Sequence, residues 1–375
     1  MPFDIRQYQP RAWSILSRGV VSGRTASTYL LHGPEGVGQW PMAISFAALL
    51  NCPQPISSED SKSLIPCGEC ASCRQIFHLN SPGLFLVVPI MSFDKVSEAI
   101  ELTNAVLDEK REEPFKILTA PRQISLSIDM AREVKKHLML KETDVRRRVV
   151  LFYQMEKMLT ASADVLLKLI EEPPADTVIL LTAERPESLL PTIQSRSQHI
   201  RLHRVPEAAA IQYLVDKYEQ DPRRAKLLVR LAEQNLGRAV ELCSSSDDGD
   251  ESNRAIGLML FKSLFHDNTP QATFRLQDLL PRADKSDVEQ LLHLWQSLTR
   301  DCANYAVNGD EAELTNIDFL PEISACAGRF SNAELSMAFM VAIKNALADL
   351  KRNVHIQIAL TALVIRLTRT IRQGH

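Results

Sequence analysis

A glycine-rich turn between an apolar strand and an apolar helix constrains this chain more than any other stretch. Residues 30–41 read Leu-Leu-His-Gly-Pro-Glu-Gly-Val-Gly-Gln-Trp-Pro. We expect a strand over Thr28–His32 and a helix over Pro41–Leu50 on either side of the glycines. In a phosphate-binding loop, such glycines allow backbone N–H groups to surround phosphates at a helix N-terminus. The layout therefore predicts an α/β domain with the shape of a nucleotide-binding fold.

The loop departs from the phosphate-binding motif at the two positions that carry its chemistry. The motif requires a glycine, four residues, and then Gly-Lys-Ser/Thr. Gly33 and Gly38 have this spacing, with Gly36 between them. Gln39 stands at the lysine position and cannot neutralise phosphate charge, and Trp40 stands at the hydroxyl position and cannot bind magnesium. We predict a degenerate, non-functional phosphate loop, and an ordinary glycine-rich turn is the alternative.

A second buried strand, predicted at Val149–Phe152, shows a defect of the same kind. A nucleotide hydrolase ends this strand in two acidic residues, one for magnesium and one to orient water. Here Tyr153 and Gln154 follow the strand, and Glu156 comes two residues late. The two defects agree and favour a chain that does not hydrolyse nucleotide. An active ATPase remains the alternative, and it requires Glu156 to reach magnesium and another cation to replace the lysine.

Clustered cysteines predict a metal site. Cys67, Cys70 and Cys73 are spaced two residues apart, and paired spacings of this kind place thiolates on a tight knuckle that can share one ion. A closed structural zinc site needs four ligands. We expect Cys52 to be the fourth, and His78 is the alternative. The alternative to a metal site is that these cysteines are reduced thiols that bind no metal.

The order of the predicted elements divides the chain into three parts. Strands and helices alternate over residues 1–203, which predicts a parallel α/β base with a zinc module at 52–73. Purely helical patterns follow, as a small lid at 204–245 and a larger helical domain at 252–375. Residues 91–121, with a helix-like stretch inside them, are expected to form a surface insertion.

Composition excludes several broad classes of protein. The 375 residues carry a net charge of −3, so no strong overall field draws the chain to nucleic acid or to an anionic membrane. We find no secretion signal and no apolar segment of the ~18–20 residues that a membrane span requires. We therefore expect a cytoplasmic protein with no membrane contact.

Three stretches in order resemble a known family. They are residues 165–174 (Val-Leu-Leu-Lys-Leu-Ile-Glu-Glu-Pro-Pro), 182–186 (Thr-Ala-Glu-Arg-Pro) and 195–197 (Ser-Arg-Ser). Together they closely resemble the bacterial DNA polymerase III clamp-loader subunits of the AAA+ class. The cysteine segment is similar to the zinc module of that family. The resemblance covers roughly residues 1–245 and implies an AAA+ parallel-sheet module with a zinc knuckle, a helical lid and an all-α C-terminal domain.

The resemblance also implies which branch of the family this chain is similar to. The gamma/tau subunits hydrolyse ATP, whereas the delta prime subunits have the fold without the ATP site. The substitutions in the glycine loop and after the second strand make this chain look like delta prime. A lid arginine that senses the γ-phosphate in family ATPases is also missing, because its position aligns with Gly237, next to Arg238. ATP is therefore expected not to bind or not to be hydrolysed.

One arginine of the family's Ser-Arg-Cys motif is kept. The motif reads Ser195-Arg196-Ser197 here, and the resemblance implies that Arg196 acts in trans as an arginine finger on the ATP of a neighbouring subunit. A surface arginine that pairs with Glu184 or Asp176 is the alternative.

The family assembles into a clamp loader, which implies the partners of this chain. They would be the gamma/tau and delta subunits, the sliding clamp, and primed DNA through the complex. Residues 252–375 would join the oligomeric collar. A catalytically active or nucleotide-binding AAA+ ATPase of DNA replication or repair is the alternative function, and a zinc-dependent nucleic-acid-binding module has less support.

Overall fold

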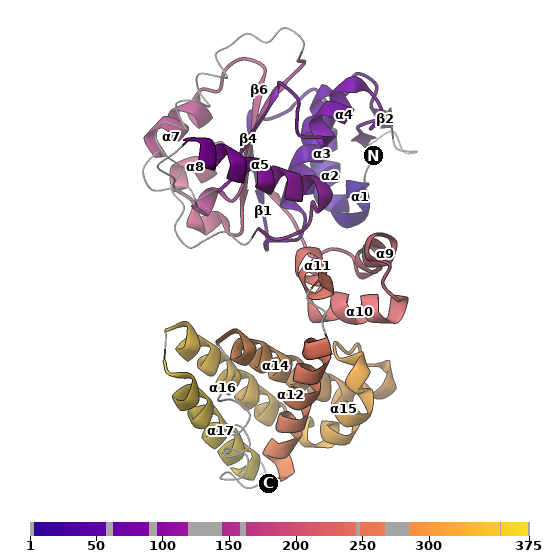
Figure 1. Cartoon of the computed structure of the whole chain (residues 1–375), viewed down its shortest axis with the longest axis vertical. Coiled ribbons are helices and arrows are strands. Elements are labelled where there is room, and N and C mark those ends of the chain that lie inside the picture. The colour runs from indigo at the N-terminus through magenta and orange to yellow at the C-terminus, as the bar shows by residue number, and fades with distance from the viewer. Residues whose placement is uncertain are drawn as a thin grey trace. The chain divides into compact units, whose positions relative to one another are not determined.

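The structure is a computed structural model that describes residues 4–57, 63–89, 96–118, 145–157, 163–244, 248–266, 285–352 and 354–373. The chain forms two compact units, Met1–Leu242 and Cys243–His375. The first contains the sheets, and the described part of the second consists of helices (Figure 1). The finer division at 1–203, 204–245 and 252–375 stays a prediction.

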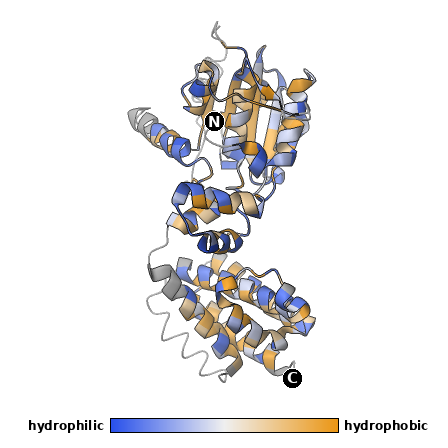
Figure 2. Ribbon diagram, turned by 90° about the vertical axis from the view of Figure 1, so that its right-hand side faces the viewer, coloured by the Kyte–Doolittle hydropathy of each residue, from blue (hydrophilic) through white to orange (hydrophobic). Residues whose placement is uncertain are grey.

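A parallel sheet of five strands forms the centre of the first unit. The strands lie in the order β4-β5-β6-β1-β7, so β1 is flanked by β6 and β7. Their apolar side chains are buried on both faces because helices cover the sheet, as expected of a parallel sheet (Figure 2). The bounds are β1 Thr28–His32, β4 Leu84–Val87, β5 Arg148–Phe152, β6 Thr177–Ala183 and β7 Gln198–Arg201. The predicted parallel α/β architecture is confirmed.

The helices around the sheet follow the predicted order. Helix α3 is buried along its whole length, in agreement with its apolar sequence. It begins at Gln39, two residues earlier than predicted, because Gly38 in the left-handed region (φ 114°) precedes it directly. The bounds are α1 Ile5–Tyr8, α2 Pro10–Val21, α3 Gln39–Asn51, α5 Val96–Glu112, α7 Ala163–Glu171 and α8 Pro191–Arg196. The sequence also predicts a helix at 127–138, and these residues lie outside the described part of the chain.

A small module follows α3 and contains the clustered cysteines. A two-stranded antiparallel hairpin, β2 Ile56–Ser57 with β3 Leu64–Ile65, precedes helix α4 Ala71–Phe77. The indole N–H of Trp13 donates to the carbonyl of Leu64 at 3.0 Å, and this bond ties the hairpin to α2.

Three helices after Pro206 form the lid region of the first unit. They are α9 Glu207–Tyr218, α10 Pro222–Leu231 and α11 Leu236–Ser244. The Asp221 carboxylate caps α10 by accepting from the backbone N–H groups of Arg223 and Arg224. The switch from alternating strands and helices to helices alone is therefore confirmed.

The second unit packs its helices around an aromatic core. Phe261, Trp295, Phe330 and Phe339 are buried there and pack edge-on or stacked. The bounds are α12 Asp248–His266, α14 Lys285–Asn308, α15 Leu320–Ala327, α16 Ala333–Lys351 and α17 Ile356–Gln373. Sequence patterns predict helices in this unit at 254–266, 269–281, 284–307, 331–350 and 353–372. They miss α15, and the helix predicted at 269–281 lies outside the described residues. Among the described helices, none combines the length and apolar character needed to cross a membrane.

Candidate functional site

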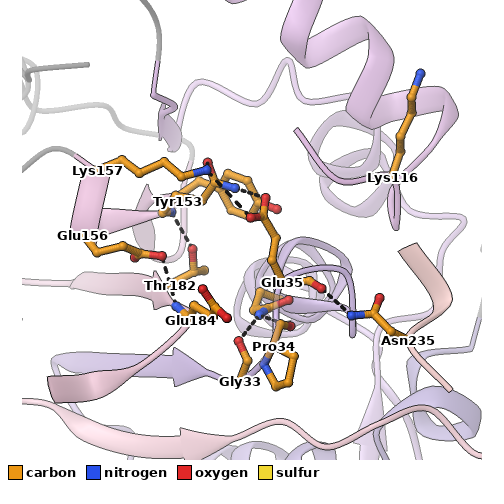
Figure 3. Close-up of polar contacts among 12 residues, drawn as sticks. Gly33, Pro34, Glu35, Lys116, Tyr153, Glu156, Lys157, Thr182, Glu184 and Asn235 are labelled. Carbon is orange, nitrogen blue, oxygen red and sulfur yellow. Dashed lines mark hydrogen bonds and ion pairs between the residues drawn. The ribbon is translucent and has the colours of Figure 1, made fainter. Parts of the chain in front are cut away.

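The glycine loop leaves the carboxyl end of β1 and enters α3, in the layout that the sequence predicts. Gly36 and Gly38 adopt positive φ angles of 88° and 114°, which a residue with a Cβ atom rarely adopts. The Gln39 side chain is buried and turns back on the loop, where its Nε2 donates to the carbonyls of Gly33 and Pro34 at 2.7 Å each (Figure 3). The amide at the lysine position therefore stabilises the loop internally.

Two aromatic rings and an amino group lie together next to the glycine loop and the end of β5. The ring centroids of Trp40 and Tyr153 are 5.2 Å apart with the planes at 89°. The Nζ atom of Lys110 lies 5.8 Å and 5.0 Å from these centroids, and 3.3 Å from the Tyr153 hydroxyl. Burial lowers the pKa of Lys110 to about 7. Sequence analysis missed Lys110, since a lone lysine in a charged helix carries no signal of burial.

Gln154, which follows β5, is also used for internal contacts. The backbone N–H of Gln154 donates to the Thr182 hydroxyl at 2.7 Å, and its side-chain amide donates to the Glu35 carboxylate. Lys157 Nζ lies 3.7 Å from the same carboxylate, so Glu35 links the glycine loop to the end of β5 (Figure 3). This network joins the glycine loop, the end of β5 and β6.

Glu156, the late acidic residue, is held by the end of β6. Its Oε1 accepts from the backbone N–H of Glu184 at 3.1 Å, and burial raises the pKa of its carboxyl group (Figure 3). The carboxylate is therefore already used to position the chain after β6.

The lid contacts the glycine loop directly. The Asn235 side-chain amide donates to the carbonyl of Glu35 at 2.7 Å, and the Gly237 N–H donates to the carbonyl of Gly36 at 2.9 Å. A Cβ atom at Gly237 would lie 2.6 Å from the Phe115 carbonyl oxygen and 2.7 Å from the Gly36 Cα. The position aligned with the phosphate-sensing arginine therefore has no space for a side chain.

The end of the insertion covers the same loop. Phe115 is 1% exposed, and its ring lies 5.0 Å from that of Tyr8 and 5.2 Å from that of Tyr213. A Cβ atom at Gly38 would lie 3.0 Å from this ring, and one at Gly36 would lie 3.0 Å from Ile117 Cδ1. The prediction of a surface insertion is therefore wrong for residues 113–118, where apolar side chains interrupt the charged sequence. Residues 91–95 and 119–121 lie outside the described residues.

Four cysteine sulfurs meet beside α3 and α4. The sulfurs of Cys52, Cys67, Cys70 and Cys73 all lie within 4.8 Å of one another, and the Cys67 and Cys73 sulfurs are 3.9 Å apart. Zn–S bonds of about 2.3 Å in a tetrahedron separate sulfurs by about 3.8 Å, so the four residues could hold one zinc ion. Among the described residues, the group that could hold a metal ion consists of these four cysteines, and His78 is not part of it.

Local structure positions these sulfurs. Cys52 follows the last turn of α3, and Cys70 caps α4 by accepting from the backbone N–H of Cys73 at 3.4 Å. Burial alone would raise the pKa of Cys67, but hydrogen bonds from the backbone N–H groups of Cys70 and Glu69 outweigh it and lower this pKa to about 6. A thiol that deprotonates readily suits metal binding, because the thiolate is the ligand.

Arg196 ends α8, and its side chain is 42% exposed. It pairs with the Glu171 carboxylate at 3.0 Å and donates to the Thr192 carbonyl at 3.2 Å. The alternative pairing with Glu184 or Asp176 is wrong, and Asp176 instead lies 3.1 Å from Arg147. Exposed ion pairs contribute about 0–1 kcal/mol, so Arg196 can exchange Glu171 for a stronger anion at little cost.

Sequence comparisons with known proteins identify the family of this chain. The sequence model described as "DNA polymerase III, delta subunit" matches residues 8–206. The delta' subunit of DNA polymerase III from Bacillus subtilis is 26% identical over 97% of both chains. The Pseudomonas aeruginosa delta' subunit is 30% identical over 59% of this chain and 56% of its own length. A gamma subunit-related protein of DNA polymerase III from Thermotoga maritima covers 96% of this chain and 99% of its own, at 15% identity and a TM-score of 0.39. The chain therefore belongs to the DNA polymerase III delta and delta prime family of clamp-loader subunits.

Proposed function

We propose that this chain is a non-hydrolysing, delta prime-like subunit of the DNA polymerase III clamp loader. It would assemble in the cytoplasm with gamma/tau and delta subunits and help to load the sliding clamp onto primed DNA. It would present Arg196 in trans to the ATP of a neighbouring subunit. The observation that carries the proposal is that the glycine loop is filled and bonded by the chain's own residues.

The absence of nucleotide binding is supported by contacts on each side of the loop. Phosphates would need the backbone N–H groups around Gly36 and Gly38 and the space above them. Phe115 and Ile117 pack against these glycines, and the Gly237 N–H is bonded to the Gly36 carbonyl. ATP would therefore have to displace both the lid and residues 113–118, without a loop lysine or a metal ligand in return.

The role of Arg196 is supported by its exposure and by its weak local partner. An arginine finger stabilises negative charge that develops on the γ-phosphate in the transition state. The guanidinium must therefore be accessible to another subunit and able to leave Glu171. Both conditions hold in the exposed ion pair at the end of α8.

Zinc would have a structural role in this protein. Four thiolates would complete a closed tetrahedron, which leaves no open position for a substrate or water. The ion would fix the hairpin β2–β3 and α4 against the end of α3.

The experiment reconstitutes the purified chain with gamma/tau, delta, sliding clamp and primed DNA, and measures ATP hydrolysis and clamp loading. The isolated chain should neither bind nor turn over ATP. Arg196→Ala should leave assembly intact and lower the ATPase rate of the complex, whereas Glu171→Gln should not. If Arg196 acts only through its pair with Glu171, the two variants will share one defect and the finger assignment fails. Turnover by the isolated chain would instead favour an active ATPase and direct attention to Glu156.

A further inference from the structure

We infer that residues 112–118, named here the latch segment, replace nucleotide as the link that fixes the lid helices to the sheet. The inference rests on the proposed function, since a nucleotide-free loop leaves that link to the protein itself. The latch segment begins at the last residue of α5 and lies between the glycine loop and α9. Its contacts on the two sides are of different kinds.

Towards the sheet, the latch segment is held by packing and by one buried lysine. The Phe115 ring lies against Gly38 and Ile117 lies against Gly36. Lys110, two residues before the segment, donates to the carbonyl of Lys116 and to the Tyr153 hydroxyl. Lys110 is almost fully buried, whereas the Lys116 side chain points away from the loop (Figure 3). The lysine therefore anchors the segment's backbone over the degenerate site.

Towards the lid, the polar contacts of the latch segment with α9 come from the Glu113 carboxylate and the Glu112 carbonyl. Glu113 lies 3.1 Å from Lys217 Nζ and accepts from the Tyr218 hydroxyl. Lys217 also donates to the carbonyl of Glu112. All these groups sit at the last turn of α9, so the segment holds that helix end at three points.

An aromatic triad joins the two sides. Tyr8 from α1, Phe115 from the latch segment and Tyr213 from α9 lie with ring centroids 5.0, 5.2 and 5.9 Å apart. Burial raises the pKa of both tyrosines. Because three distant segments interlock and close packing tolerates few alternative arrangements, the lid has one orientation on the sheet in the absence of nucleotide.

The test is amide hydrogen exchange of the full chain without nucleotide. Glu113→Gln should accelerate exchange in α9 and α10 about threefold, the size expected for a partly exposed ion pair. Phe115→Leu should accelerate it about tenfold, since it shortens a fully buried side chain. Exchange in β5 should not change. Glu112→Gln is the matched control, because the Glu112 carboxylate is exposed and only its backbone carbonyl contacts the lid; it should have no effect.

The inference is overturned if the amide exchange rates in α9 and α10 are unchanged in both variants. It is also overturned if exchange in β5 accelerates equally, because that indicates a general loss of stability. Addition of ATP and magnesium to the wild-type chain tests the proposed function separately from the inference about the latch segment. If ATP and magnesium newly protect residues 36–40 from amide exchange, the chain binds nucleotide and the proposed function fails. The variants are compared without nucleotide, so that comparison still tests the latch segment.

Discussion

The backbone N–H of Gly237 donates to the carbonyl of Gly36 at 2.9 Å, which places the lid in direct contact with the glycine loop. In a family ATPase, the resemblance places a phosphate-sensing arginine at the first of these positions. Here the two backbones are in contact, and a Cβ atom at Gly237 would lie 2.7 Å from the Gly36 Cα. Several measurements can test this description.

The first prediction concerns Gly237 itself. Gly237→Ala should lower the free energy of unfolding by about 1–3 kcal/mol, because the added methyl group would overlap the Phe115 carbonyl and the Gly36 Cα. Urea unfolding followed by circular dichroism measures the change. Gly328→Ala is the control, since no heavy atom lies within 4 Å of the point where its Cβ would stand and the effect there should be small. Equal effects at both positions would show that Gly237 is not closely packed.

The second prediction concerns the lost motif. The double variant Gln39→Lys/Trp40→Thr restores the residues that bind phosphate and magnesium, yet it should not bind ATP. The latch segment still fills the loop, and removal of the buried Trp40 ring leaves a cavity that should cost about 3–5 kcal/mol. Titration with a fluorescent ATP analogue is the measurement. Micromolar affinity in the double variant would mean that the two substitutions alone had closed the site.

The third prediction concerns metal. Cys70→Ser should reduce bound zinc from about one ion per chain to a small fraction and lower Tm by more than about 4 °C. Elemental analysis and thermal unfolding test both effects. Cys243→Ser is the comparison, because Cys243 is buried outside the four-cysteine group and should leave the zinc content unchanged. Full zinc content in Cys70→Ser would exclude Cys70 as a ligand.

The fourth prediction concerns pH and Lys110. Burial lowers the pKa of Lys110 to about 7. The charge of Lys116 also lowers this pKa, whereas the carboxylates of Glu35, Glu109 and Glu241 raise it. From about pH 7 to pH 10, the unfolded chain therefore binds more protons at this residue than the folded chain does. Stability should rise with pH in that window, by up to about 1.4 kcal/mol per pH unit for one proton.

Lys110→Met keeps the length of the side chain and removes the titration. Urea unfolding of both proteins at pH 7, 8 and 9 isolates the lysine, since all other groups titrate in both. The range stops below pH 10 because burial raises the pKa of Tyr153, which would oppose the trend at higher pH. Parallel pH profiles for the two proteins would show that Lys110 ionises as it does in water.

Sequence patterns predicted the parts of the fold that depend on local composition. The strand at Thr28–His32 is observed with the predicted bounds, and the sheet follows from apolar runs of strand length. The four cysteines come together because their spacing and the end of α3 place them on one knuckle. These features depend on residues that are near one another in the sequence, so they could be predicted from the sequence alone.

The contents of the degenerate site depend on distant residues and could not be predicted in the same way. Phe115 follows a run of charged residues, and nothing near it indicates contacts with Tyr8 and Tyr213, roughly a hundred residues away on either side. Lys110 is buried next to the rings of Trp40 and Tyr153, which lie far from it in the sequence.

The covalent attachment of Phe115 to the chain has a further consequence. A free ligand fills its site according to its concentration, whereas a tethered group is present at an effective concentration of millimolar order that dilution does not change. Under this arrangement, the orientation of the lid would be the same in an energy-starved cell and in a growing one. The subunit would then offer its neighbours a constant geometry while the ATP supply around it rises and falls.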